Sequence, residues 1–196
     1  SYAWVEDGRL KLRLASGEEG EASFFNLYSL GLVPLGAELE FSLTVEELVS
    51  SNRHDISVFL ANEVETYPEQ GLQMRFVVSS DGIEVCISKR VKGAWEDVWS
   101  SPLYQPPYTA SCRVELGPEV AVELDGQVVW SGENWLSPLS WLLLWNVARS
   151  TEPLVASYEY LHVKPPSLRV LYELAPEDVG KGDVCLFDTM GEEEEG

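Results

Sequence analysis

Aromatic residues interleaved with polar ones are the feature of this sequence that best suits ligand chemistry. The chain holds 7 Trp and 8 Tyr in 196 residues. Sugar rings pack their C–H groups on aromatic faces, while neighbouring polar side chains bind the hydroxyls. Two loop-like stretches combine both residue types. The first, 95–108, contains a proline-rich segment, and the second, 132–135, contains an asparagine. The candidate ligand-binding residues are Trp95, Trp99, Tyr104, Tyr108, Asn134 and Trp135.

Other tryptophans lie in segments that are predicted to be strands. Trp4, Trp141 and Trp145 are among them, and we expect these three in the core. The longest apolar run, 141–145, is far shorter than the roughly 18 residues that span a membrane.

Paired carboxylates are the second feature that could do chemistry. A retaining glycosidase needs two carboxyl groups about 5–5.5 Å apart, one as nucleophile and one as acid/base. Glu38 and Glu40 alternate along one predicted strand and would share a face. A solvated outer face on a very acidic protein explains the same pattern, so catalysis by this pair is the alternative interpretation.

Other catalytic and metal-binding patterns are absent from the sequence. It has two histidines, far apart in the chain, and three cysteines without a CxxC spacing. No G-x-S-x-G nucleophile pattern occurs. These absences argue against a zinc site and against a serine-type or histidine-dependent enzyme.

The charge balance excludes several classes of partner. There are 13 Lys plus Arg against 33 Asp plus Glu, and the formal net charge is −20. Such a chain cannot neutralise a phosphate backbone, and it is repelled by anionic membranes. We therefore expect neither nucleic-acid binding nor membrane insertion.

The dominant hydrophobic period is two, which is typical of strands with one buried face. Asp-Gly pairs at 7–8, 81–82 and 125–126 favour two-residue hairpin turns, and the first would place Glu6 opposite Arg9. We predict an all-β fold, a two-sheet antiparallel β-sandwich or jelly roll. Its predicted strands are 2–6, 9–15, 21–29, 37–45, 55–62, 71–79, 82–89, 94–99, 108–116, 119–124, 127–131, 140–148 and 154–163.

Residues 164–196 differ from the rest of the chain. They contain three basic and nine acidic residues and close on a run of four glutamates. We predict a domain over 1–163 and a C-terminal arm over 164–196 that ends in an acidic tail. Residues 168–174 could add an edge strand, either to the same domain or to a second copy of the chain in a homo-oligomer.

The order of these segments resembles the concanavalin A-like lectin/glucanase jelly roll, including laminin G-like modules, over residues 1–163. Hydrolases of that superfamily carry Glu-x-Asp-x-Glu along one strand, and this chain lacks that motif. Lectins and laminin-type modules often bind calcium, for which Asp81, Asp97 and Asp125 are candidate ligands, although hairpin aspartates are usually turn formers. The segments that carry the resemblance are 8–10, 36–41, 56–60, the hairpin 72–89, 112–116, 122–130 and 158–163.

The resemblance implies a non-catalytic recognition module that binds carbohydrate through loop aromatics. The alternatives are a structural protein of a virion, tail or cell surface that binds other protein subunits, and a glycoside hydrolase with a non-standard carboxylate pair. No signal-peptide pattern opens the sequence. An extracellular, cell-surface or virion location is nevertheless expected over a cytoplasmic one.

Overall fold

The computed structural model describes residues 1–64, 68–166, 185–187 and 193–195, and every regular element in these ranges is a β-strand. The strands are β1 (Tyr2–Glu6), β2 (Arg9–Leu14), β3 (Ser23–Pro34), β4 (Glu38–Val45), β5 (Arg53–Ala61), β6 (Gly71–Ser79), β7 (Ile83–Val91), β8 (Ala94–Ser100), β9 (Tyr108–Leu116), β10 (Glu119–Leu124), β11 (Gln127–Glu133), β12 (Leu139–Ala148), β13 (Leu154–Lys164), β14 (Cys185–Phe187) and β15 (Glu193–Glu195).

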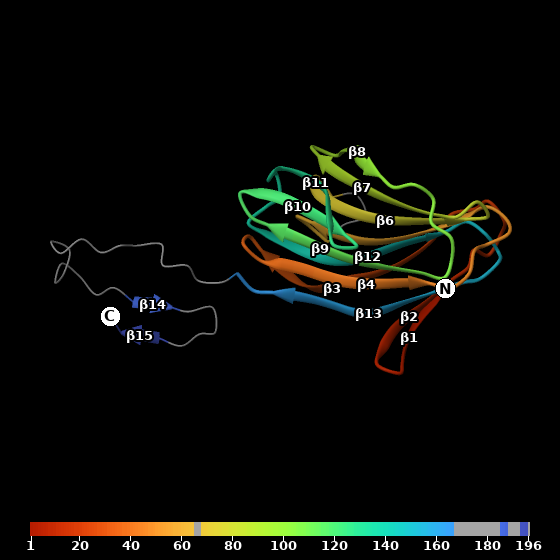
Figure 1. Ribbon diagram of the computed structural model, residues 1–196, viewed down its shortest axis with the longest axis horizontal. Helices are drawn as coiled ribbons and strands as arrows, with labels where there is room; N and C mark the ends of the chain where they lie inside the picture. The colour runs from red at the N-terminus through yellow and green to blue at the C-terminus, as the bar shows by residue number, and fades with distance from the viewer. Residues whose placement is uncertain (65–67, 167–184, 188–192, 196) are drawn as a thin grey trace.

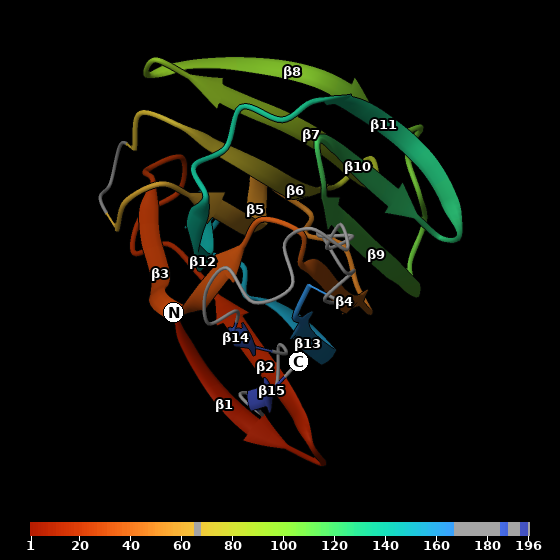
Figure 2. The same ribbon diagram turned by 90° about the vertical axis from the view of Figure 1, so that its left-hand side faces the viewer.

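Two antiparallel sheets pack face to face as a sandwich (Figures 1 and 2). The seven-stranded sheet has the order β1-β2-β13-β4-β9-β10-β11, and the six-stranded sheet has the order β3-β12-β5-β6-β7-β8. Strands β14 and β15 form a separate two-stranded pair. The predicted all-β sandwich is confirmed. The segment 168–174, with the oligomer contact expected of it, lies outside the described residues.

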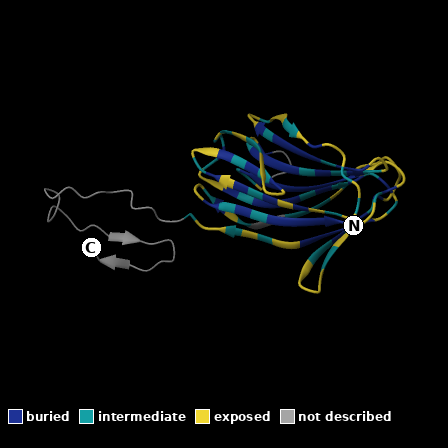
Figure 3. Cartoon of the chain, in the orientation of Figure 1, coloured by how far each residue is buried: buried dark blue, intermediate teal, exposed yellow. Residues whose placement is uncertain are grey.

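The core lies between the sheets because alternate side chains of each strand point inward (Figure 3). Phe41 on β4 meets Phe76 on β6 edge to face across the two layers, with ring centroids 6.3 Å apart. Burying a side chain of this size contributes about 1.5–3 kcal/mol. The free thiols of Cys86 and Cys112 are also buried. Within the described ranges, no helix could cross a bilayer.

The hairpin turns follow the sequence prediction at two of three places. Asp7-Gly8 and Asp125-Gly126 have the positive φ angles of a type I′ turn. At 81–82 that expectation is wrong, because Gly82 alone has a positive φ, of 151°. A Cβ on Gly82 would lie 2.8 Å from the carbonyl oxygen of Tyr104, so glycine is needed there for the close approach of that loop.

The first hairpin shows the expected register but different ion pairs. Glu6 lies opposite Arg9 as predicted. Arg9 instead pairs with Glu159 at 3.1 Å, and Glu6 pairs with Lys11. The adjacent strand β13 supplies the competing carboxylate, and a diagonal neighbour supplies the competing amine.

Candidate functional site

The candidate site is a depression of about 340 Å³ on the outward face of the six-stranded sheet. Strand β5 points Ile56 and Val58 into the core and turns Asp55 and Ser57 to this face. The strand register then sets outward residues side by side, as with Ser57 opposite Arg75 on β6. The depression is therefore made by strands, whereas the sequence predicted a site made by loops.

Three rings, Phe59, Trp95 and Trp145, form an aromatic cluster at this face. Trp145 stacks on Phe59 with centroids 5.3 Å apart, and Trp95 lies 5.4 Å from Phe59 and 6.2 Å from Trp145. Phe59 is buried beneath the two indoles, while Trp95 is 40% exposed. The indoles thus line the depression and present partly exposed ring surface to a ligand.

Polar side chains from several strands line the rest of the depression. Gln73 donates a hydrogen bond to Ser57 at 2.9 Å, and Ser88 donates one to Asp97. Two ion pairs lie here, Arg53 with Asp55 at 3.5 Å and Arg75 with Asp97 at 3.8 Å. The polar cluster is Arg53, Asp55, Ser57, Gln73, Arg75, Ser88, Asp97 and Arg149.

Three buried polar atoms of this face have no hydrogen-bond or ion-pair partner among the described residues. They are Nε of Arg75, Nε of Arg149 and Nε1 of Trp145. A buried polar group without a partner costs about 1–3 kcal/mol. Such atoms at one depression are polar groups that a ligand or water could satisfy.

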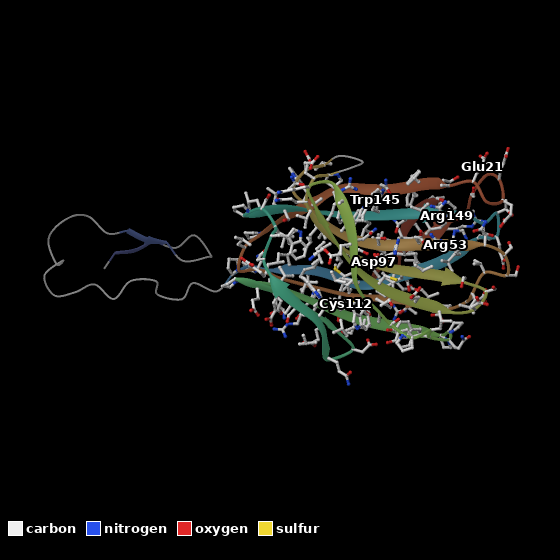
Figure 4. All side chains as sticks on the ribbon, turned by 90° about the horizontal axis from the view of Figure 1, so that it is seen from above. Glu21, Arg53, Asp97, Cys112, Trp145 and Arg149 are labelled. Carbon is white, nitrogen blue, oxygen red and sulfur yellow. The ribbon has the colours of Figure 1, made fainter. Side chains whose placement is uncertain are left out.

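Arg53 and Arg149 lie together at one end of this face. The amide of Arg149 donates to the carbonyl of Arg53 at 3.2 Å, so the two residues are neighbours on adjoining strands. Figure 4 places Trp145 and Asp97 away from this pair. The depression therefore has an aromatic end and an arginine end.

Of the residues predicted from sequence, Trp95 lies in the depression. Trp99 packs against the core. Tyr104 and Tyr108 stack on one another at 4.2 Å, and the Tyr108 hydroxyl donates to Asp125. Burial and that carboxylate raise the pKa of Tyr108. These contacts give the two tyrosines structural partners away from the depression.

Asn134 and Trp135 also have structural partners. The Asn134 amide donates to the carbonyl of Gly117 at 2.8 Å, and its oxygen accepts from the amide of Leu136. The Trp135 indole donates to the carbonyl of Arg90 at 3.0 Å. The structure does not bring these two residues to the aromatic cluster.

The expectation that Trp4, Trp141 and Trp145 are core residues is wrong. All three are partly exposed, and Trp141 and Trp145 pack on the outer side of the six-stranded sheet with Phe59 and Leu143. The reason is that β12 is apolar on both faces, so its sequence does not say which side meets the core. Alternation of Arg53, Asp55 and Ser57 with inward residues on β5 was the available signal for a polar outer face.

Glu38 and Glu40 lie on the outer face of the other sheet, in a network of ion pairs. Glu38 contacts Arg113 at 2.7 Å and Lys164 at 3.1 Å, and Glu40 contacts His162 at 2.9 Å. The hydrogen bond from Arg113 lowers the pKa of Glu38 to about 2. A general acid needs a raised pKa, so this geometry disfavours catalysis by the pair.

The three candidate calcium ligands lie apart. Asp81 is in the β6–β7 hairpin, Asp97 is on β8, and Asp125 is in the β10–β11 turn. Asp125 accepts hydrogen bonds from Tyr108 and from the amide of Ser111. Across the ranges that the structure describes, no three His, Cys, Asp or Glu residues form a group that could hold a metal ion.

Comparison with known proteins finds similarity only to solved structures. No protein-family model and no curated protein matches the sequence. One similar structure comes from work on endo-acting O-glycanases, which prominent members of the human gut microbiota express to initiate mucin breakdown. It aligns over 81% of this chain and 80% of its own, with a TM-score of 0.61 and 16% identity. A native glycosidic hydrolase aligns over 85% and 82% (0.60, 13%).

The carbohydrate-binding module CBM66 from Bacillus subtilis aligns over 83% of this chain and 91% of its own, with a TM-score of 0.54 and 12% identity. The likeness is one of fold. It shows that this β-sandwich is shared with a carbohydrate-binding module and with a glycosidic hydrolase.

Proposed function

We propose that this protein binds a glycan on the outward face of the six-stranded sheet and does not cleave it. The observation that carries the proposal is the placement of two partly exposed indoles, Trp95 and Trp145, beside the polar cluster in one depression. Flat apolar ring faces next to convergent polar groups suit a sugar, whose own surface alternates C–H patches with hydroxyls.

The aromatic cluster supplies the stacking surface. Arg90 contacts the Trp95 ring 5.1 Å from its centroid, and the ring of Phe59 packs 5.4 Å from the same ring. Both contacts restrict the indole before a ligand arrives, and a pre-ordered side chain costs less entropy on binding.

The polar cluster supplies the hydrogen bonds. Nε of Arg75 and Nε1 of Trp145 supply unpartnered donors, and the carboxylates of Asp55 and Asp97 supply acceptors. A sugar hydroxyl both donates and accepts, so it could satisfy either kind. The depression, of about 340 Å³, is of the size that small ligands fill.

Binding without hydrolysis is supported by the spacing of the two carboxylates that line the depression. Asp55 on β5 and Asp97 on β8 are separated by three strand spacings, about 14 Å at the usual distance between strands. Glycosidases need carboxyl groups roughly 5–9.5 Å apart. In the described part of this face, no strand carries a second carboxylate two residues from the first.

The shared fold adds weight, because the concanavalin A-like resemblance of the sequence and the likeness to CBM66 both concern glycan-binding sandwiches. Carbohydrate binding by loop aromatics is replaced in this proposal by binding on the sheet face. Calcium binding stays a separate prediction from the sequence, and the site described above does not use it.

The test is a glycan array followed by titration of tryptophan fluorescence with each hit. Trp95→Ala should weaken binding about tenfold or more, as expected for a central aromatic contact. Trp4→Ala is the matched control, because Trp4 packs against Tyr2 in the β1–β2 hairpin of the other sheet. An array without hits, or equal affinities for wild type and Trp95→Ala, would overturn the proposal.

A further inference from the structure

We infer that the glycan bound on this face is acidic, with a carboxylate or a sulfate seated at the arginine end while a neutral ring stacks on the aromatic cluster. This inference rests on the proposed function and names the class of glycan that the site selects. It comes from the charges and the unpartnered donors of the depression.

The lining carries an excess of positive charge in a strongly acidic protein. Three arginines, Arg53, Arg75 and Arg149, face two aspartates, whereas acidic residues outnumber basic ones 33 to 13 in the whole chain. Arg53 and Arg75 each have an aspartate partner. Arg149 forms no ion pair with any described residue, so one positive charge at this face is unmatched.

The two ion pairs of the lining are also incomplete. Their N–O separations of 3.5 and 3.8 Å exceed the roughly 2.7–2.9 Å of a charge-assisted hydrogen bond. An arginine has five N–H donors in a planar fork, and loose contacts of this kind leave most of them for another acceptor. The arginines therefore keep donors available to a ligand.

Arg75 and Arg149 also have buried donors that need an acceptor. The Nε atom of each is buried and lacks an acceptor among the described residues. A guanidinium that has lost water at Nε without gaining an acceptor is destabilised, and a planar anion that binds two of its N–H groups offsets that cost. Carboxylate and sulfate oxygens have the geometry to do so.

The layout sets a minimum length for the ligand. Trp145 and Arg149 are four residues apart on one strand line, about 13 Å between their Cα atoms. Because Trp145 and Arg149 line different ends of the depression, we place the stacked ring and the acidic group on different units of an oligosaccharide. Arg53 lies beside Arg149 and would share the anion (Figure 4).

The net charge of the protein limits how acidic the ligand can be. With a formal charge of −20, the chain repels a densely charged polymer, while a single unmatched arginine can neutralise one anion locally. The preferred ligand is therefore a mostly neutral oligosaccharide with one acidic group per binding site.

The test uses pairs of oligosaccharides that differ by one acidic group, titrated by calorimetry into the full chain. Carboxylate pairs are a xylo-oligosaccharide with and without one glucuronic acid branch, and sialyllactose against lactose. A sulfate pair is 6-sulfolactose against lactose. We expect the acidic member of at least one pair to bind about tenfold more tightly, since a hydrogen bond to a charged group is of that strength. The pair that shows the gain identifies the anion as carboxylate or sulfate.

Arg149→Gln should abolish that advantage, so that the acidic and the neutral member of the pair bind the variant with equal affinity. Arg9→Gln is the matched control, because it removes the same charge from an exposed ion pair in the other sheet. Near-ultraviolet circular dichroism checks that both variants fold.

Three outcomes distinguish a failure of the acidic-glycan inference from a failure of the proposed glycan binding. Neutral members that bind as tightly as acidic ones overturn the inference and leave glycan binding standing. An acidic preference that survives Arg149→Gln also overturns it. Absence of binding by every member, together with an array without hits, overturns both proposals.

Discussion

The indole of Trp145 stacks on the phenyl ring of Phe59, with the two planes inclined by 20°. The ring of Phe59 in turn lies over Gly71 on the neighbouring strand, where a Cβ atom would meet it at 2.3 Å. The same Cβ would also lie only 2.8 Å from the carbonyl oxygen of Leu60, so there is no room for a side chain at position 71. The aromatic cluster thus depends on a residue without a side chain.

Gly71→Ala should therefore disturb both stability and binding. The added methyl must displace the Phe59 ring or the strand, and overpacking of this kind costs about 1–3 kcal/mol. Urea unfolding measures that loss, and a weaker fluorescence response to the best glycan reports the displaced indoles. Gly31→Ala is the control, since a Cβ at Gly31, in the same sheet, meets nothing within 4 Å. Equal losses in the two variants would contradict the packing argument.

The carboxylate of Glu38 should make stability depend on acidic pH. Arg113 and Lys164 lower its folded-state pKa to about 2 from the ordinary 4.5. Its stabilisation is therefore complete above pH 4.5 and is lost as the pH falls toward 2. The side chain is 22% exposed, so after solvent screening the contribution is about 1 kcal/mol.

Urea unfolding of Glu38→Gln at pH 7 and at pH 3 checks this expectation. The variant should be less stable than wild type at pH 7, and the gap should narrow at pH 3. Glu21→Gln makes the same change of net charge at a carboxylate that forms no ion pair with a described residue. A gap that stays constant with pH would count against the assignment.

The buried imidazole of His54 should also make stability depend on pH, at values nearer to neutrality than those at which Glu38 titrates. Burial lowers its pKa below 6.5, although its Nε2 contacts the carbonyl oxygen of Glu152 at 2.8 Å. The unfolded chain therefore takes up a proton before the folded one does, so stability is fully present above pH 6.5 and declines as the pH falls through the folded pKa. Nδ1 has no acceptor among the described residues, which adds to the cost of protonation.

His54→Gln should flatten the decline in stability between pH 7 and pH 5, because glutamine keeps a donor for the carbonyl of Glu152 but does not titrate. Chemical unfolding at several pH values gives the slope. Nuclear magnetic resonance titration of the wild-type ring measures the pKa directly, and a midpoint at or above 6.5 would refute the argument.

Most strands could be predicted from the sequence because period two is a local signal. Strands 2–6, 71–79, 108–116 and 119–124 match the structure at both ends, and the others differ by a few residues. The loop expected between strands 82–89 and 94–99 is a tight turn at Lys92-Gly93, in which Lys92 has a positive φ of 51° that is unusual for this residue type.

The candidate site could be predicted only in part. Trp95 was found because aromatics and polar residues are adjacent in the sequence near it. Trp145 and Arg149 were missed, since the pairing of β12 with β5 depends on contacts between segments almost 90 residues apart. Which face of β12 meets the core is decided by that pairing and not by its own residues.

The same strands of the six-stranded sheet hold the two layers together with one set of side chains and line the depression with the alternate set. Because the sets point in opposite directions, exchanges among the outward residues leave the interior packing in place. The protein therefore has the build of an adaptable scaffold, on which evolution or engineering could change the lining of the depression while the folded framework persists.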